Sequence, residues 1–212
     1  MAVKLPDGTL FALATNTAAA VTMTALSNAE EAVPTLSGTP NLNPGDVVVV
    51  QSGWSGINDR VAKLGTGNKL SGFDTRDLQR FPAGGGAGSL AKVDSWVQVS
   101  QILSSESSGG EQQFLTYSFL ENDFESQIPT QTSPISLTLS IADDDTLPGF
   151  LALKAASDAR EQRVLRATLP GGSTLYYHAY VSLNETPSTT KGQLMAVSAT
   201  FSLVSRFTRY SA

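Results

Sequence analysis

The sequence predicts a mainly β protein of the α+β class. Serine and threonine alternate with apolar residues over much of the chain, and this period of two is typical of strands that bury one face. Residues 135–141 give the clearest case, with four aliphatic side chains on one face and three hydroxyl side chains on the other. The same pattern in residues 195–203 predicts a second strand of the same sheet.

Composition limits the class of function. The chain has 212 residues, of which 41% are hydrophobic and only 16% are charged, and its formal net charge is -5. This length fits one large all-β domain or two small ones, and the low charge indicates a surface that partners cover. Net negative charge gives no general affinity for nucleic acid, because phosphates repel it. The absence of cysteine excludes disulfides, thiolate metal sites and cysteine nucleophiles.

Residues 1–44 are expected to form an N-terminal arm and the first strands. Polar residues interrupt the apolar stretch 10–26, so we expect neither a membrane span nor a membrane partner. Lys4 and the small residues 18–20 have the outline of a signal peptide. The turn-forming residues 6–8 stand where its apolar region would begin, and we therefore expect no such signal.

Residues 45–82 are expected to form a small β module, because short β-rich stretches alternate there with turns. Residues 83–89 are rich in glycine and are expected to connect this module flexibly to the main β domain, residues 90–212. No Lys-Ser or Lys-Thr pair follows the glycines, so they do not match a phosphate-binding loop.

Two hairpins are predicted in the main domain. Residues 96–103 and 114–120 form the first, joined by a long loop at residues 104–113, a type of loop that often carries contacts. Residues 164–183 form the second around Pro170-Gly171-Gly172-Ser173, which supplies the dihedral angles of a tight turn.

One helix is predicted near residues 147–160. Thr146 is expected to cap it and Pro148 to occupy its first turn. The acids at 143–145 are expected to stabilise its positive end; a metal site is the alternative that we disfavour. The apolar stripe at helical spacing consists of Leu147, Phe150, Leu151 and Ala155.

No set of residues predicts an enzyme, a cofactor site or a metal site. His178 is the single histidine, and no catalytic or metal-binding partner recurs at a useful distance along the sequence, so we expect it on a polar or interface face. There is no Gly-x-Ser-x-Gly nucleophile motif. Acidic pairs such as Asp143 with Asp145 are too common to indicate glycoside hydrolysis.

An aromatic surface leaves one binding function open. Alternation places Tyr176 and Tyr180 on one strand face, and Trp54 and Trp96 add further aromatic area. Such side chains stack on sugars, but they are equally enriched at protein interfaces. A carbohydrate-binding β-sandwich module is therefore an alternative to an assembly protein.

Three stretches resemble the major tail tube proteins of long-tailed phages. They are SESSGGEQQF at residues 105–114 with Tyr117, residues 151–166, and YYHAYVSLNETP at residues 176–187. The resemblance covers residues 90–210. The segment 45–61 is similar to small β modules that occur in several phage structural proteins, including proteins other than tube subunits.

This resemblance implies a β-sandwich or barrel-like core with one flanking helix. It also implies rings of six subunits, stacked by an N-terminal arm and a long hairpin loop into a conduit for the genome. The implied partners are other copies of the chain, a tape measure protein, tail terminator and tail-tip initiator proteins, and viral DNA in transit. The implied locations are the virion tail and, during assembly, the bacterial host cytoplasm. Another phage structural component, such as a baseplate, adaptor or head-decoration protein, is the alternative.

Within this frame, strands with a hydroxyl face are expected to join across subunits into a closed barrel whose hydroxyl side lines or coats the tube. Net negative charge suits passage of a polyanion without sticking. Polar residues in and after the long loop are the candidates for contact between rings: Glu106, Glu111, Gln112, Gln113, Glu121, Asp123 and Glu125.

Overall fold

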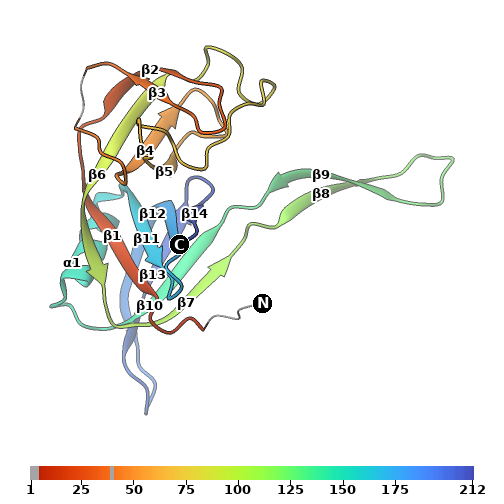
Figure 1. Cartoon of the computed structure of the whole chain (residues 1–212). Helices are drawn as coiled ribbons and strands as arrows, with labels where there is room; N and C mark the ends of the chain where they lie inside the picture. Colours follow the sequence, from red (N-terminus) through yellow and green to blue (C-terminus); the bar gives the residue numbers. More distant parts are fainter. Residues whose placement is uncertain (1–4, 39–40) are drawn as a thin grey trace.

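The computed structural model describes residues 5–38 and 41–212, and Figure 1 shows a compact body from which a long hairpin projects. Within the described residues the chain forms fourteen strands and one helix, which confirms the mainly β prediction. The elements are β1 (Leu10–Thr17), β2 (Val21–Leu26), β3 (Pro34–Leu36), β4 (Val47–Ser52), β5 (Arg60–Lys63), β6 (Gly88–Val99), β7 (Ile102–Ser108), β8 (Gln112–Tyr117), β9 (Ser126–Thr132), β10 (Ser136–Ala142), α1 (Pro148–Ala159), β11 (Gln162–Thr168), β12 (Thr174–Ser188), β13 (Ala196–Leu203) and β14 (Thr208–Tyr210).

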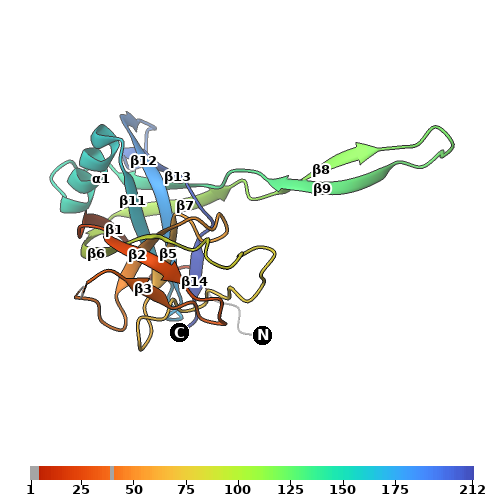
Figure 2. The same cartoon turned by 90° about the horizontal axis from the view of Figure 1, so that it is seen from above.

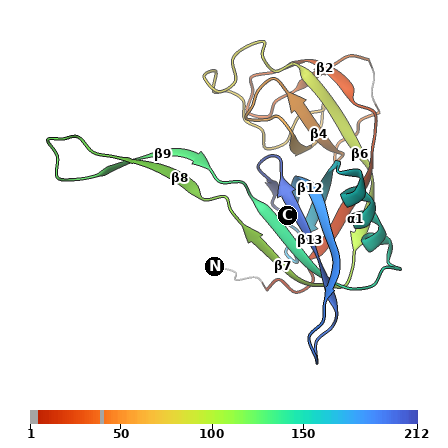
Figure 3. The same ribbon diagram turned by 180° about the vertical axis from the view of Figure 1, so that it is seen from behind.

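One antiparallel sheet organises the body, in the order β6-β1-β11-β12-β13-β10-β7. Strand β1 lies between β6 and β11, and its residues 11–14 are buried in the core. Lys4, considered above for a signal peptide, lies outside the described residues. The long strand β6 continues upward and pairs there with β2 and β4, which joins the sheet to a small lobe (Figure 3).

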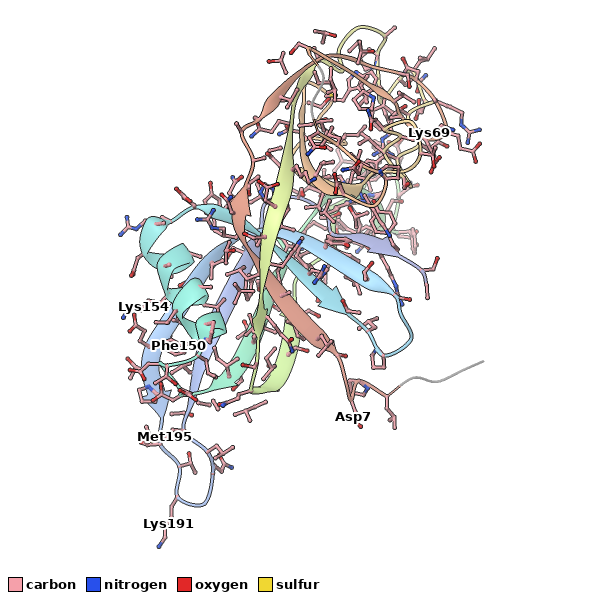
Figure 4. All side chains as sticks on the ribbon, turned by 60° about the vertical axis from the view of Figure 1, so that its left-hand side comes forward. Asp7, Lys69, Phe150, Lys154, Lys191 and Met195 are labelled. Atoms are coloured by element: carbon pink, nitrogen blue, oxygen red, sulfur yellow. The ribbon has the colours of Figure 1, made fainter. Side chains whose placement is uncertain are left out.

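Helix α1 covers one face of the sheet and closes the largest core. The predicted pairing of residues 135–141 with residues 195–203 is confirmed: β10 and β13 are antiparallel neighbours with Leu137 opposite Phe201. Their apolar side chains meet Phe150 and Leu153 of α1, whose position is visible in Figure 4. Phe201, Leu139 and Leu153 are completely buried.

The start of the helix differs from the prediction. Leu147, not Thr146, is the N-cap, and no side chain caps the helix there. Asp144 instead accepts hydrogen bonds from the Thr146 backbone N–H and hydroxyl, at 3.1 and 2.6 Å. These bonds hold the pKa of Asp144 below its usual value. Asp144 therefore stabilises the turn before the helix and does not cap the helix itself. Pro148, at the first turn of the helix, has no N–H and so needs no capping partner for its nitrogen.

The buried stripe of the helix also differs from the prediction. Phe150 is buried as expected, but Leu151 is half exposed and Ala155 is exposed. The residues that face the sheet are Gly149, Phe150, Leu153 and Ala156. Gly149 lies so close to the Gln98 carbonyl that a Cβ would overlap it, and this close approach sets the rotation of the helix.

The small lobe contains β2, β3, β4, β5 and the first residues of β6 around a core of its own. Trp54 lies at its centre, and its indole N–H donates to the Pro82 carbonyl at 2.9 Å. Residues 83–86 form a turn packed on that tryptophan, with Gly86 buried against the ring. A Cβ on Gly86 would lie within 3.0 Å of the indole ring, so this position requires glycine.

The lobe packs against the sheet face opposite α1. Val47, Val49 and Val61 of the lobe contact Val164 and Tyr176 of the sheet. The Tyr210 hydroxyl, at the end of the chain, accepts from the Lys63 N–H at 2.8 Å and donates to the Ser71 carbonyl at 2.9 Å. Burial raises the pKa of Tyr210 to about 12, so this link is insensitive to pH across the physiological range.

His178 lies in this junction, and the prediction that it occupies a polar or interface face is wrong. It is only 5% exposed, and its Nδ1 lies 2.8 Å from the Asp59 carbonyl oxygen. A carbonyl only accepts, so Nδ1 carries the proton and donates it. Burial lowers the pKa of His178, although its bond to the Asp59 carbonyl and the Asp59 carboxylate act in the other direction.

We expect this histidine to make the fold sensitive to mild acid. A lowered folded-state pKa means that the unfolded chain binds the proton first, so stability is complete above pH 6.5 and is lost as the pH falls below it. Urea denaturation at about pH 7.5 and about pH 5.5 measures the loss. His178→Asn keeps an amide donor near the position of Nδ1 but does not titrate, and it should remove most of the difference. An equal pH dependence in both proteins would contradict this assignment.

Of the two predicted hairpins, only the second is confirmed. Strands β11 and β12 pair around residues 170–173, with Gly172 at a φ of 81°. In the first, residues 104–108 are not loop but belong to β7, which pairs with β10, while β8 pairs with β9. Polar side chains lie on both faces of β7, so the segment has no apolar alternation by which a strand could be predicted.

Candidate assembly surfaces

The projecting hairpin, which we call the arm, consists of β8, β9 and the tip at residues 118–125. Within the part of the chain that the structure describes, its two strands pair only with each other, and Figure 2 shows the arm extending far from the body on one side. An isolated two-stranded hairpin is marginally stable in water, and its unpaired edges invite other chains. The arm therefore depends on partners for its stability.

The arm carries many large apolar side chains that remain exposed to solvent. Leu115 faces Ile128 across the strands, and Tyr117 meets Phe119 edge to face with ring centroids 5.6 Å apart. At the tip, Leu120 is fully exposed and Phe124 is 74% exposed. Such a concentration of exposed apolar residues marks an interaction surface. The exposed set is Phe114, Leu115, Tyr117, Phe119, Leu120, Phe124 and Ile128.

A glycine pair fixes where the arm leaves the body. Gly109 and Gly110 both have a φ of 81°, and a Cβ on Gly109 would overlap the Pro134 carbonyl oxygen. The two strands lie side by side here, and Glu111 donates its N–H to the Ser133 hydroxyl at 3.0 Å. Only glycine combines this backbone conformation with so close an approach.

The fold separates the seven polar residues predicted for contact between rings. Glu121, Asp123 and Glu125 lie together at the tip of the arm, and Gln112 and Gln113 lie on β8. Glu111 lies at the base of the arm, while Glu106 lies on β7 in the main sheet. All seven residues are exposed to solvent.

The sequence analysis missed the apolar tip residues. Phe119, Leu120 and Phe124 alternate irregularly with the acids, so neither strand nor helix periodicity identified them. A signal was present: three large apolar residues stand in a short segment that also carries three acids. That combination is unusual for a solvated turn and is typical of a contact with a partner.

A second surface is the sheet face opposite α1 beyond the edge of the small lobe. Because cross-strand partners share a face, the registers place three rows of polar side chains over β7, β10, β13 and β12. We call this the hydroxyl face. Its rows are Ser108-Ser136-Ser202-Tyr180, Glu106-Thr138-Thr200-Ser182 and Ser104-Ser140-Ser198-Asn184, and Tyr180 is their one aromatic residue.

The side chains of the hydroxyl face are chemically uniform. Neighbouring hydroxyls bond to each other, with Ser108 2.7 Å from Ser136 and Thr138 3.3 Å from Thr200. The rows contain no lysine, arginine or large aliphatic residue, and Glu106 is their one charged side chain. At its border, β7 pairs among the described residues only with β10, so its other edge is open to a further strand.

The aromatic platform considered for sugar binding is not formed. Tyr176 and Trp54 are buried, at 5% and 2% exposure, in two different cores. Tyr180 is exposed, but its hydroxyl accepts a hydrogen bond from Gln162. Tyr176 and Trp54 therefore pack in the cores, and Tyr180 does not share an exposed surface with them.

The described residues contain no group of three or more His, Cys, Asp or Glu side chains that could hold a metal ion. No helix among them is long and apolar enough to cross a membrane.

Together, the all-antiparallel fold, the unsupported arm and the hydroxyl face beside a free strand edge define a structural β protein whose surfaces await partners. The chain belongs to the phage tail tube protein (TTP) family, whose model matches residues 52–212. It is thus a structural component of a phage tail.

Two solved structures are similar to the chain. One is a chain of the tube-terminating cap of the anti-feeding prophage. It has 20% sequence identity and a TM-score of 0.38, and the match covers 54% of this chain and 83% of that one. The baseplate of the same particle, six-fold symmetrised, yields a chain that is 9% identical with a TM-score of 0.38, over 82% of this chain and 98% of that one. No curated protein matches the sequence.

Proposed function

We propose that the protein is the repeating subunit of a tail tube, and that six copies form a ring and rings stack into the conduit for the genome. The observation that carries this proposal is the hydroxyl face beside the unpaired edge of β7. A strand of a neighbouring subunit that pairs with that edge would continue the sheet, and repetition around an axis would close it into a barrel without edges.

In this assembly the hydroxyl face lines the lumen. Serine and threonine hydroxyls exchange hydrogen bonds with water readily, and they present no cation to a passing phosphate backbone. Each cation on the wall would add affinity for DNA and therefore drag. Glu106 then contributes one carboxylate per subunit to the wall, and we assign it to the lumen and not to the contact between rings.

The arm makes the contacts between subunits and between rings. Its apolar residues supply the buried area, and Gln112, Gln113, Glu111 and the tip acids supply polar contacts at the rim, as is usual for interfaces. The remaining partners follow from a tube: a tape measure protein that fills the lumen during assembly in the host cytoplasm, an initiator at the tail tip and a terminator at the other end.

Electron microscopy of the purified chain at high concentration tests this function. We expect hollow rings or tubes in negative stain, with six-fold symmetry in end-on views. Closed rings that never stack would favour a cap or baseplate component. A chain that stays monomeric in the presence of isolated tail tips would contradict the proposal.

The lumen assignment predicts a gain of DNA binding in one variant. Glu106→Lys should assemble normally but place a ring of ammonium groups on the wall, so its tubes should retain a short fluorescent duplex at low salt. That binding should fall steeply as salt rises. Glu30→Lys adds the same charge on the small lobe and serves as the matched control. Loss of assembly in Glu106→Lys alone would return Glu106 to the contact between rings.

A further inference from the structure

Three arginines meet in a cleft between the small lobe and the sheet. Arg60 and Arg80 come from the lobe and Arg206 from the segment between β13 and β14, around a cavity of about 400 Å³. Figure 1 shows this junction beside the base of the arm, and the Arg206 guanidinium lies 3.5 Å from the Thr132 hydroxyl there. We call this the arginine cleft.

The positive charge of the cleft is not neutralised within the described part of the chain. None of the three arginines forms an ion pair there, whereas Arg76 and Arg163 do. Burial is the larger cause that lowers the pKa of Arg60, and the charges of Arg206 and Arg80 lower it further, so both repel the charge of Arg60. The Nε of Arg60 is buried without a hydrogen-bond partner. Asp59 is the one carboxylate that lines the cleft, and three guanidinium groups outnumber it.

Two of the arginines are positioned by aromatic rings. Arg60 lies over the Phe73 ring at 4.6 Å and Arg80 over the Phe81 ring at 5.5 Å. Both rings are buried, and the residues that line the cleft beside the arginines are mostly polar. Outside this lining, Leu78 is close to Arg80 in sequence and is 60% exposed. Arginines positioned in this way are suited to bind carboxylates.

The arm tip has the complementary chemistry. It carries Glu121, Asp123 and Glu125 among Phe119, Leu120 and Phe124, and residues 112–132 contain no lysine or arginine. The tip points away from the body and lies far from its own cleft in all three ribbon views (Figures 1, 2 and 3). A cleft that binds this tip must therefore belong to another copy of the chain.

We propose that the arginine cleft is the receptor for the arm tip of a second copy of this chain. The contact joins two different surfaces, so it is heterologous and repeats from subunit to subunit, which is the arrangement that closes into rings or continues along a stack. This proposal rests on the proposed function and names the partner surface that the arm requires. Pairing of the tip acids with the cleft arginines would determine which copy the arm binds and in which position.

The absence of cysteine from the chain makes a disulfide test unambiguous. One full-length variant carries Asn122→Cys at the tip and another carries Ser55→Cys on the rim of the cleft, and neither change alters a charge. Mixed and oxidised at a concentration that supports assembly, they should form the mixed disulfide. Thr66→Cys, on an exposed turn of the same lobe, replaces Ser55→Cys in the control, and we expect at least tenfold less cross-linking there.

Charge reversal then tests the chemistry of the contact. Arg80→Glu with Arg206→Glu, both exposed positions, should reduce the tip-to-cleft disulfide at least tenfold. Adding Glu121→Arg, Asp123→Arg and Glu125→Arg to the tip partner should restore it. Circular dichroism of each monomer verifies folding. Restoration by the swapped pair is an outcome that simple damage to either surface would not produce.

The outcomes separate this inference from the proposed function. Tubes without the specific disulfide overturn the inference and leave the function, whereas the disulfide without rings or tubes supports the inference and overturns the function. If neither the disulfide nor tubes form, both the inference and the proposed function are overturned. Binding of a short DNA duplex that the arginine reversals abolish, without the disulfide, would assign the cleft to phosphates and overturn the inference.

Discussion

Replacing the arm tip by a two-residue turn should abolish assembly and leave the monomer intact. Tyr117 and Ser126 are cross-strand partners, so Asn-Gly in place of residues 118–125 closes the hairpin with a turn of suitable geometry. No arm residue belongs to any of the three cores, and thermal unfolding should therefore be unchanged. The loss of Phe119, Leu120 and Phe124 should weaken association by about a hundredfold or more, as for the central residues of other interfaces.

Sedimentation velocity of the shortened and original proteins measures this effect directly. Leu151→Ser is the matched control, because it removes an equally exposed apolar side chain from α1, outside the arm. Assembly should survive that change. If the shortened arm still supports rings or tubes, the arm is not the main contact.

Phe201→Ala should cost about 3–5 kcal/mol of unfolding free energy, which is the usual range for truncating a fully buried phenylalanine. Phe201 is completely buried between α1 and the sheet, opposite Leu137 on one side and Val181 on the other. A cavity there removes contacts with both neighbouring strands and with the helix. The effect should equal a large share of the stability of the whole chain.

Urea denaturation monitored by circular dichroism measures the loss. Ser202→Ala, at the next position on the hydroxyl face, should change the unfolding free energy by no more than about 0.5 kcal/mol. A small effect at both positions would show that β13 is not the centre of the core.

Strand patterns with one apolar face were sufficient to predict part of this fold. Alternation in residues 135–141 and 195–203 predicted a shared sheet, and the registers confirm it through Leu137 and Phe201. Alternation failed for β7, because Ser104 to Ser108 lies at the sheet edge with polar side chains on both faces. Without an apolar period, nothing in that segment distinguishes an edge strand from a loop.

Other differences arise from packing that no local pattern contains. Both Leu147 with Leu151 and Phe150 with Leu153 have a spacing that fits one face of a helix. The close approach of Gly149 to Gln98 turns the face with Phe150 and Leu153 toward the sheet. His178 was correctly placed on the face of Tyr176, but the lobe that covers this face comes from residues more than a hundred positions earlier.

The candidate site was predictable only where it is local in sequence. The tip acids lie close together in the sequence and could be named as candidates from it, whereas the hydroxyl face requires the registers of four strands. Arg60, Arg80 and Arg206 give no signal in the sequence, because only the docking of the lobe on the sheet brings them together. Surfaces formed by several elements depend on the tertiary structure in this way.

A cryo-electron microscopy reconstruction of assembled tubes tests the central claim most directly. The account predicts six copies of the chain per ring, with β7, β10 and β13 around the lumen and the Ser and Thr side chains of the hydroxyl face on its wall. Helix α1 should lie behind that wall. Tubes whose lumen is lined by α1 or by the small lobe would contradict the account.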